Sequence, residues 1–198
     1  MNHLAHLRLS PPDPHWRLGA LLGDFVRGTD LSAHPDGVRR GIELHRAIDA
    51  FTDAHPVFAQ SRRRIDGPLR RFSGVLVDVF YDHFLLRRWD EIGSGEHAAA
   101  FASDAYALLR DHRELLHGAI HTHLDRMIEN RWLEKSADLE GVRTVLGRIA
   151  MRMRREVALE DGAELLRRDY AAFAADFDSF WPDVEVFART RSGFVVAN

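Results

Sequence analysis

Hydrophobic residues recur at helical spacing along almost the whole chain. Between residues 41 and 55, Leu44, Ile48 and Phe51 fall at positions i, i+4 and i+7, which form one face of a helix. Residues 74–89 are apolar nearly all round, a pattern typical of a central, buried helix. The same spacing recurs in five later segments, at residues 97–109, 113–133, 139–155, 162–177 and 180–189.

Strand signals are weak, and proline-rich turns separate the helical segments. No segment alternates apolar and polar residues over a sustained length, as a half-buried strand does. The run Pro11-Pro12-Asp13-Pro14 divides the first two segments, and His55-Pro56 ends the helix predicted at residues 41–55. We therefore predict an all-α protein, a single domain over residues 1–198 with about eight helices.

Composition and charge narrow the class of protein. The 198 residues carry a formal net charge of −3, which excludes a globally basic nucleic-acid binder, and the absence of cysteine excludes disulfides and thiolate metal sites. No apolar run approaches the roughly 20 residues needed to cross a bilayer. The first six residues lack the pattern of a secretory signal. We expect a soluble, cytoplasmic protein that binds neither nucleic acid nor membrane.

Three groups of polar side chains interrupt apolar helical segments in the first 90 residues. They lie at Asp24, at His45, Asp49, Thr52 and Asp53, and at Asp78, Asp82 and His83. His45 and Asp49 are four residues apart, so both project from one helix face, and the same spacing relates Asp78 to Asp82. A buried carboxylate is costly unless it is paired or bound to a metal. The three groups are therefore candidates to converge on a divalent cation inside a helical bundle.

Each group also has an ordinary structural explanation. Asp24 alone can cap a helix or pair with Arg27, and Asp49 can pair with Arg46 on the protein surface. A single histidine such as His45 is more often a satisfied core or surface residue than a ligand. If a metal is bound, imidazole and carboxylate ligands without thiolate suit Mn²⁺, Fe²⁺ or Mg²⁺ better than a structural zinc.

A second set of histidines lies further along the chain, at His112, His117, His121 and His123. His117 and His121 have i, i+4 spacing, but no glutamate stands between them as in a zinc protease motif. Charged residues surround them. We interpret this set as a solvated polar face.

Four blocks of the chain carry specific patterns. They are Met1-Asn2-His3-Leu4-Ala5-His6-Leu7, Leu22-Gly23-Asp24-Phe25-Val26-Arg27-Gly28, Gly41 to Pro56 with Leu44-His45-Arg46, Ile48-Asp49 and Phe51-Thr52-Asp53, and Val77 to Leu85 with Tyr81-Asp82-His83-Phe84. Together they resemble the acyl carrier protein phosphodiesterase family, and the likeness spans nearly the whole chain. His3 is a small departure, because an aromatic residue is expected there.

This resemblance implies a cytosolic enzyme that cleaves 4′-phosphopantetheine from the serine of holo acyl carrier protein with a divalent metal, usually manganese. The family is regarded as a distant, all-helical branch of the HD phosphohydrolases, which bind metal through an early His, a His-Asp dyad and a late Asp. By that pattern His6 is the early His, Asp24 belongs to the dyad, and Asp78 is the late Asp. Gly23 stands where the dyad His is expected. We infer that His45 supplies the missing imidazole or a ligand to a second metal.

The sequence leaves the catalytic roles open. Asp49, Asp82 and His83 are the candidates to orient the attacking water or to protonate the leaving group. Two other functions also fit the sequence. One is an HD-type phosphohydrolase of a nucleotide or another small phosphoester, and the other is a non-catalytic helical module that binds an acidic protein.

Charge is distributed unevenly along the chain. Residues 39–89 hold ten arginines against six acidic residues, a net charge of +4, which leaves −7 for the rest of the chain. Because acyl carrier protein is strongly acidic, this asymmetry favours electrostatic steering of the substrate to the segment that holds the candidate site. Generic surface charge is the alternative explanation. The best docking candidates are Arg62, Arg63, Arg64, Arg70 and Arg71.

Overall fold

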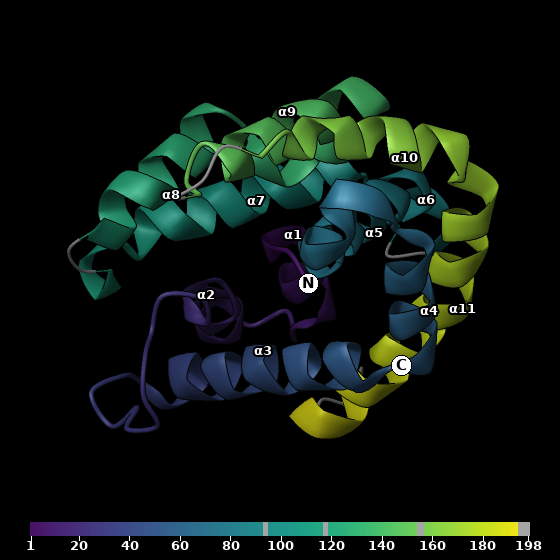
Figure 1. The fold of residues 1–198 in the computed structure, drawn as a ribbon. Coiled ribbons are helices and arrows are strands. Elements are labelled where there is room, and N and C mark those ends of the chain that lie inside the picture. The colour runs from purple at the N-terminus through teal and green to yellow at the C-terminus, as the bar shows by residue number, and fades with distance from the viewer. Residues whose placement is uncertain (93–94, 117–118, 154–156, 194–198) are drawn as a thin grey trace.

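The helical spacing of the sequence corresponds to helices throughout the computed structural model (Figure 1). The structure describes residues 1–92, 95–116, 119–153 and 157–193, and within these ranges it contains no strand. Eight α-helices there have nine or more residues: α2 (Pro14–Leu22), α3 (Asp36–Ala54), α4 (Pro56–Arg64), α5 (Ser73–Arg87), α7 (Ala98–Asp111), α8 (Ala119–Glu129), α9 (Leu139–Ala150) and α11 (Tyr170–Ser192). The all-α prediction is confirmed, although the described residues contain more helices than the expected number of about eight.

Shorter helices connect these elements. They are the α-helices α1 (His3–Leu9), α6 (Trp89–Ile92) and α10 (Gly162–Arg168), and the 3₁₀ helices η1 (Gly67–Phe72), η2 (Arg113–Leu115), η3 (Trp132–Ala137) and η4 (Leu159–Asp161). Proline sets two of the boundaries, as the sequence indicated. Pro14 opens α2 with Asp13 as its N-cap, and Pro56 opens α4 directly after α3 ends.

The helix α5 is the centre of the hydrophobic core. Its apolar side chains point in all directions, and Leu76, Val77, Phe80 and Leu85 are completely buried. Such a helix needs neighbours on every side, and α5 contacts α1, α4, α9, α11 and η3. Of the two acidic residues that α5 carries, Asp82 is therefore buried, whereas Asp78 is partly exposed.

The N-terminal helix α1 lies between two groups of helices. Figure 1 shows α7, α8, α9 and α10 on one side of it and α2 with α3 on the other, while α4 and α11 run alongside the ends of both groups. The helix α1 contacts α2, α5, α11 and η3. This arrangement brings His6 of α1 next to the middle of α3, although nearly 40 residues separate the two in sequence.

Several segments differ from the helices expected from sequence, among them 162–177, which is divided between α10 and α11. The segment 113–133 is divided into η2, α8 and the start of η3, with Arg131 in a left-handed conformation (φ 50°) that ends the helical path. In contrast, α11 continues through Pro182, which lacks the N–H that would bond to the preceding turn. Buried Phe180, Trp181 and Val184 pack this part of α11 into the core and hold it helical.

The carboxylate of Asp176 joins α11 to α4. It is buried, accepts hydrogen bonds from Ser61 and Gln60, and accepts two more from the Arg64 guanidinium at 2.7 and 3.1 Å. Arg64 was predicted from sequence to dock an acidic partner. In the structure the partly exposed Arg64 guanidinium forms an ion pair with buried Asp176, and its role in docking stays a prediction.

Candidate metal centre

The His45 imidazole has a fixed hydrogen-bonding direction. It projects from the middle of α3, is 2% exposed, and places Nδ1 2.7 Å from the carbonyl oxygen of Ala20 in α2. Because a carbonyl oxygen only accepts hydrogen bonds, Nδ1 is the protonated nitrogen. In the neutral ring the lone pair is therefore on Nε2, which points toward the carboxylates of Asp24 (3.3 Å) and Asp49 (3.2 Å).

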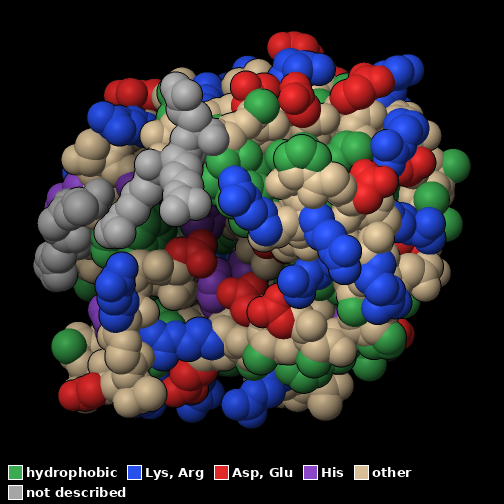
Figure 2. Space-filling view, in the orientation of Figure 1, with side chains coloured by type: hydrophobic (Ala, Val, Ile, Leu, Met, Phe, Trp, Pro, Cys, Tyr) green, Lys and Arg blue, Asp and Glu red, His purple; other side chains and the backbone are tan. Residues whose placement is uncertain are grey.

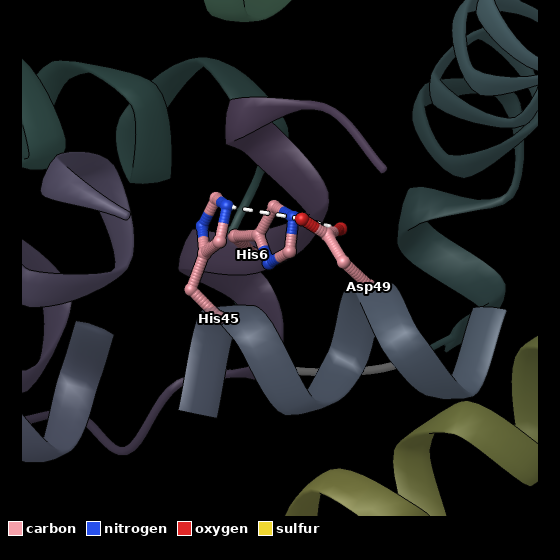
Figure 3. A group of neighbouring side chains, drawn as sticks. All are labelled: His6, His45 and Asp49. Atoms are coloured by element: carbon pink, nitrogen blue, oxygen red, sulfur yellow. Dashed lines mark ion pairs between the residues drawn. The ribbon is translucent and has the colours of Figure 1, made fainter. Parts of the chain in front are cut away.

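His6 and Asp49 complete a compact group around His45. The His6 and His45 rings stack with their centroids 3.7 Å apart, and His6 Nε2 lies 3.1 Å from Asp49 Oδ1 (Figure 3). His45 and Asp49 rise from α3, whereas His6 comes from α1. Each of the three side chains offers a ligand atom, and these atoms all lie within 4.8 Å of one another. We call His6, His45 and Asp49 the His–His–Asp cluster.

Gly23 makes room for His45. A Cβ atom built on Gly23 would lie 2.2 Å from Cγ of the His45 ring, far inside van der Waals contact. The His45 ring thus occupies the space that a side chain at position 23 would need. This packing explains how glycine can stand beside Asp24 at the position where the dyad histidine was expected.

The surroundings of the cluster stabilise a protonated His45 beside an ionised Asp49. Burial alone would lower the pKa of His45, but the contacts to Asp24 and Asp49 outweigh it and raise that pKa to about 9. Burial would raise the pKa of Asp49, yet His45, His6 and the Met1 ammonium hold it far below its usual range. Completely buried His6 is different, since burial dominates and lowers its pKa to about 3. One proton therefore resides on His45 at neutral pH, and His6 is neutral.

Asp78 and Asp82 of α5 lie beside the cluster. The Met1 ammonium is 3.1 Å from Asp49 Oδ1 and 3.5 Å from Asp78 Oδ1, so it bridges α3 and α5. Burial raises the pKa of Asp78, while the Met1 ammonium opposes this shift. Burial also raises the pKa of Asp82, to about 8, and nearby Asp78 adds to the effect. Asp82 therefore holds a proton at pH 7.

The structure does not bring His83 to the cluster. Its Nδ1 contacts the backbone oxygen of Ser136 at 2.8 Å, and its Nε2 contacts the hydroxyl of Tyr170 at 2.9 Å. Since His83 follows Asp82 on α5, its side chain is turned by about 100° around the helix. His83 therefore connects α5 to η3 and α11.

One histidine near the site was misinterpreted from sequence. His123 was grouped with a solvated face, but it contacts Phe25 and Trp132, and burial lowers its pKa to about 4. Its position on the partly buried side of α8 was obscured by the charged residues around it. His121 fits the sequence interpretation better, with Nε2 bonded to an exposed backbone oxygen, and His117 lies outside the described residues.

The cluster has the donors that a divalent cation needs. Both ring nitrogens of His6 are buried and have no hydrogen-bond partner within the described ranges, although Nε2 lies close to Asp49 Oδ1. Buried polar atoms normally have a partner, and an imidazole without one is available as a ligand. Figure 2 shows histidine and acidic side chains within a hollow of the surface, with Lys and Arg side chains around it. The residues present thus fit an oxygen- and nitrogen-ligated cation.

Replacing Gly23 by alanine tests the packing against His45. The added Cβ would collide with the ring, and we expect Gly23→Ala to lower the free energy of unfolding by about 2 kcal/mol, as overpacking does. Urea denaturation measures this loss. Gly74→Ala is the matched control, because nothing lies within 4 Å of its Cβ, and it should stay within about 1 kcal/mol of the parent. Equal stabilities of the two variants would contradict the packing.

The raised pKa of His45 predicts a pH-dependent stability of the metal-free protein. The charged ring stabilises the folded state fully below the unfolded pKa of about 6.5, and this contribution is lost as pH rises through about 9. The difference in unfolding free energy between the parent and His45→Gln should therefore shrink by about 3 kcal/mol from pH 6 to pH 9.5. Urea denaturation in the presence of a chelator checks this. A difference that does not change with pH would contradict the ion pair.

Comparison with known proteins identifies the family of this chain. The family model described as acyl carrier protein phosphodiesterase matches residues 1–184. Proteins named acyl carrier protein phosphodiesterase include one from Salmonella paratyphi A, 34% identical over 97% of this chain and 100% of its own length, and one from Photorhabdus laumondii, 32% identical over 92% of each chain. No solved structure matches the chain with significance. The chain belongs to the acyl carrier protein phosphodiesterase family.

Proposed function

We propose that this protein hydrolyses holo acyl carrier protein to apo acyl carrier protein and 4′-phosphopantetheine, using a divalent cation held by His6, His45 and Asp49. The family to which the chain belongs supplies the reaction class. The observation that carries the proposal is the His–His–Asp cluster, with its ligand atoms within 4.8 Å of one another. The proposal includes a cytoplasmic location, which is where the substrate is expected.

Asp24 extends the ligand set, and Asp78 flanks it. The Asp24 carboxylate lies beside His45 Nε2 and opposite Asp49, so it can occupy a fourth position around a cation. Asp78 lies on the far side of the Met1 ammonium from Asp49, where it adds negative charge. We propose Mn²⁺, the metal that the family resemblance implies, and Mg²⁺ or Fe²⁺ can occupy the same imidazole and carboxylate donors. Compared with the sequence-based proposal, Asp49 becomes a ligand instead of a proton-transfer group.

The reaction adds water to phosphorus and releases the serine oxygen. A cation in the cluster supplies polarisation of a phosphoryl oxygen and a lowered pKa for water. The chain itself must deliver a proton to the departing serine oxygen. Asp82 is the candidate donor, because burial keeps its carboxyl protonated at pH 7 and it lies on α5 one turn beyond Asp78. His83, engaged by Ser136 and Tyr170, has no part in this proposal.

A basic surface next to α5 is the proposed docking site for the acidic carrier protein. Arg62 and Arg63 at the end of α4 are exposed, as are Arg70 and Arg71 of η1. The helix α5 begins directly after η1, so Asp78 lies about 9 Å further along the helix axis than the end of η1. Steering by the four arginines would bring the substrate serine to the side of the protein that carries the acidic groups.

An assay with holo acyl carrier protein tests the proposed activity. Protein stripped of metal and then supplied with Mn²⁺ should release 4′-phosphopantetheine, detected by mass spectrometry of the carrier protein. Asp49→Asn should reduce kcat at least about 100-fold while the helical circular dichroism is retained, because it removes a ligand carboxylate. Asp53→Asn, one turn further along α3 and exposed, is the matched control and should keep near-parental activity. Activity on nucleotides alone, or full activity of Asp49→Asn, would contradict the proposal.

Charge reversal tests the docking surface. The double variant Arg62→Glu/Arg63→Glu should raise KM for holo acyl carrier protein about tenfold and weaken the dependence of kcat/KM on salt, with kcat unchanged. A control pair, Arg143→Glu/Arg167→Glu, reverses two exposed arginines of α9 and α10 outside the basic segment. An equal change in KM for both pairs would show that only overall charge matters.

A further inference from the structure

A cavity of about 110 Å³ lies beside the His–His–Asp cluster and contains none of its three residues. It is bounded by residues 2–4 at the start of α1, by Asp82 of α5, by His123 of α8, by η3, and by α9 with the turn after it. His3 connects the cavity to the cluster, because its Nδ1 is 3.5 Å from Asp24 Oδ2. Since a single water needs roughly 10–15 Å³ by the same measure, the space holds several water-sized groups.

Unpaired polar atoms concentrate in the wall of this cavity. Nine buried side-chain nitrogen or oxygen atoms in the described ranges have no hydrogen-bond partner. Four of the nine belong to residues that line this one space, namely His3 Nδ1, His123 Nε2, Trp132 Nε1 and Arg148 Nη1. Buried polar groups are normally satisfied, so four unsatisfied nitrogens around one cavity indicate a place where a ligand provides the partners.

The chemistry of the wall restricts that ligand. The indole of Trp132 and the guanidinium of Arg148 can only donate hydrogen bonds, so the ligand must present acceptor oxygens. The guanidinium carbons of Arg148 and Arg152 lie 5.7 and 5.3 Å from the centre of the Trp132 ring, which holds these donors in place before a ligand arrives. The remaining wall is largely aliphatic, with Leu4, Leu133, Val145 and Ile149. A ligand that carries hydrogen-bond acceptors on a narrow aliphatic chain therefore matches this wall.

We propose that this cavity binds the pantetheine arm of the substrate, an uncharged chain of amides and methylene groups. The inference rests on the proposed function, which places the phosphoryl group at the neighbouring cluster. The amide carbonyls would accept hydrogen bonds from Trp132 and Arg148, and the methyl and methylene groups would lie against Leu133 and Ile149. Asp82 lines the cavity on α5, one turn from Asp78, so the end of the arm that carries the phosphate would lie on the side of the cavity nearest the acidic groups.

Titration with free pantetheine, which has neither phosphate nor carrier protein, tests this assignment. Chemical-shift titration of ¹⁵N-labelled protein should show saturable binding that moves the Trp132 indole N–H signal. Ile149→Trp fills the cavity and should weaken binding at least tenfold, whereas Val186→Trp adds the same side chain at a position 57% exposed and should bind as the parent does. Trp132→Phe keeps the ring but removes the donor, and should weaken binding severalfold without a risk to folding.

Three results of these titrations would contradict the arm site or replace it with another kind of site. No binding of pantetheine to the parent, or parental affinity in both Ile149→Trp and Trp132→Phe, would overturn the arm site. A shift of the indole signal by inorganic phosphate, and not by pantetheine, would replace it with an anion site. Hydrolysis of holo acyl carrier protein is measured in parallel. If the parent hydrolyses holo acyl carrier protein but does not bind pantetheine, only the arm site is contradicted. If it binds pantetheine but does not hydrolyse holo acyl carrier protein, only the proposed function is contradicted.

Discussion

The position of the His45 imidazole determines the geometry of the whole site. Its Nδ1 is tied to the carbonyl oxygen of Ala20, so α2 sets the ring plane, and α3 sets where the ring begins. The ring can lie there only because residue 23 has no side chain. Once it is in place, Nε2 faces two carboxylates and the ring supports His6 by stacking. A single backbone hydrogen bond thus orients the imidazole that we propose as a ligand, as second-sphere contacts commonly do in metal sites.

The surrounding core explains why so much charge can be buried. Three carboxylates, two imidazoles and the Met1 ammonium share a small region, and their opposite charges offset much of the cost of removing them from water. Asp82 is a different case, since its burial outweighs the attraction of the Met1 ammonium and its carboxyl retains the proton. The same protein therefore holds Asp49 ionised and Asp82 neutral at pH 7, which are the states that a ligand and a proton donor require.

Sequence periodicity was sufficient for the fold class and for the buried position of α5, because a helix that is apolar all round has only one stable environment. The i, i+4 spacing also placed His45 and Asp49 on one face correctly. It could not bring His6 to them, because that contact depends on how α1 packs on α3. The sequence also gave no sign that Arg64 pairs with Asp176, 112 residues away, or that His123 turns inward among charged neighbours. These features depend on packing between residues far apart in sequence, and local sequence patterns carry no information about that packing.

We propose that His6, His45 and Asp49 hold one divalent cation. Mn²⁺ binding to the chelator-treated protein, followed by electron paramagnetic resonance with pulsed detection of nearby nitrogen nuclei, tests this. We expect one ion per chain with coupling to two imidazole nitrogens, one of which disappears in His6→Gln, while Asp53→Asn binds like the parent. Mn²⁺ that binds without histidine coupling, or that binds equally well to His6→Gln, would contradict it.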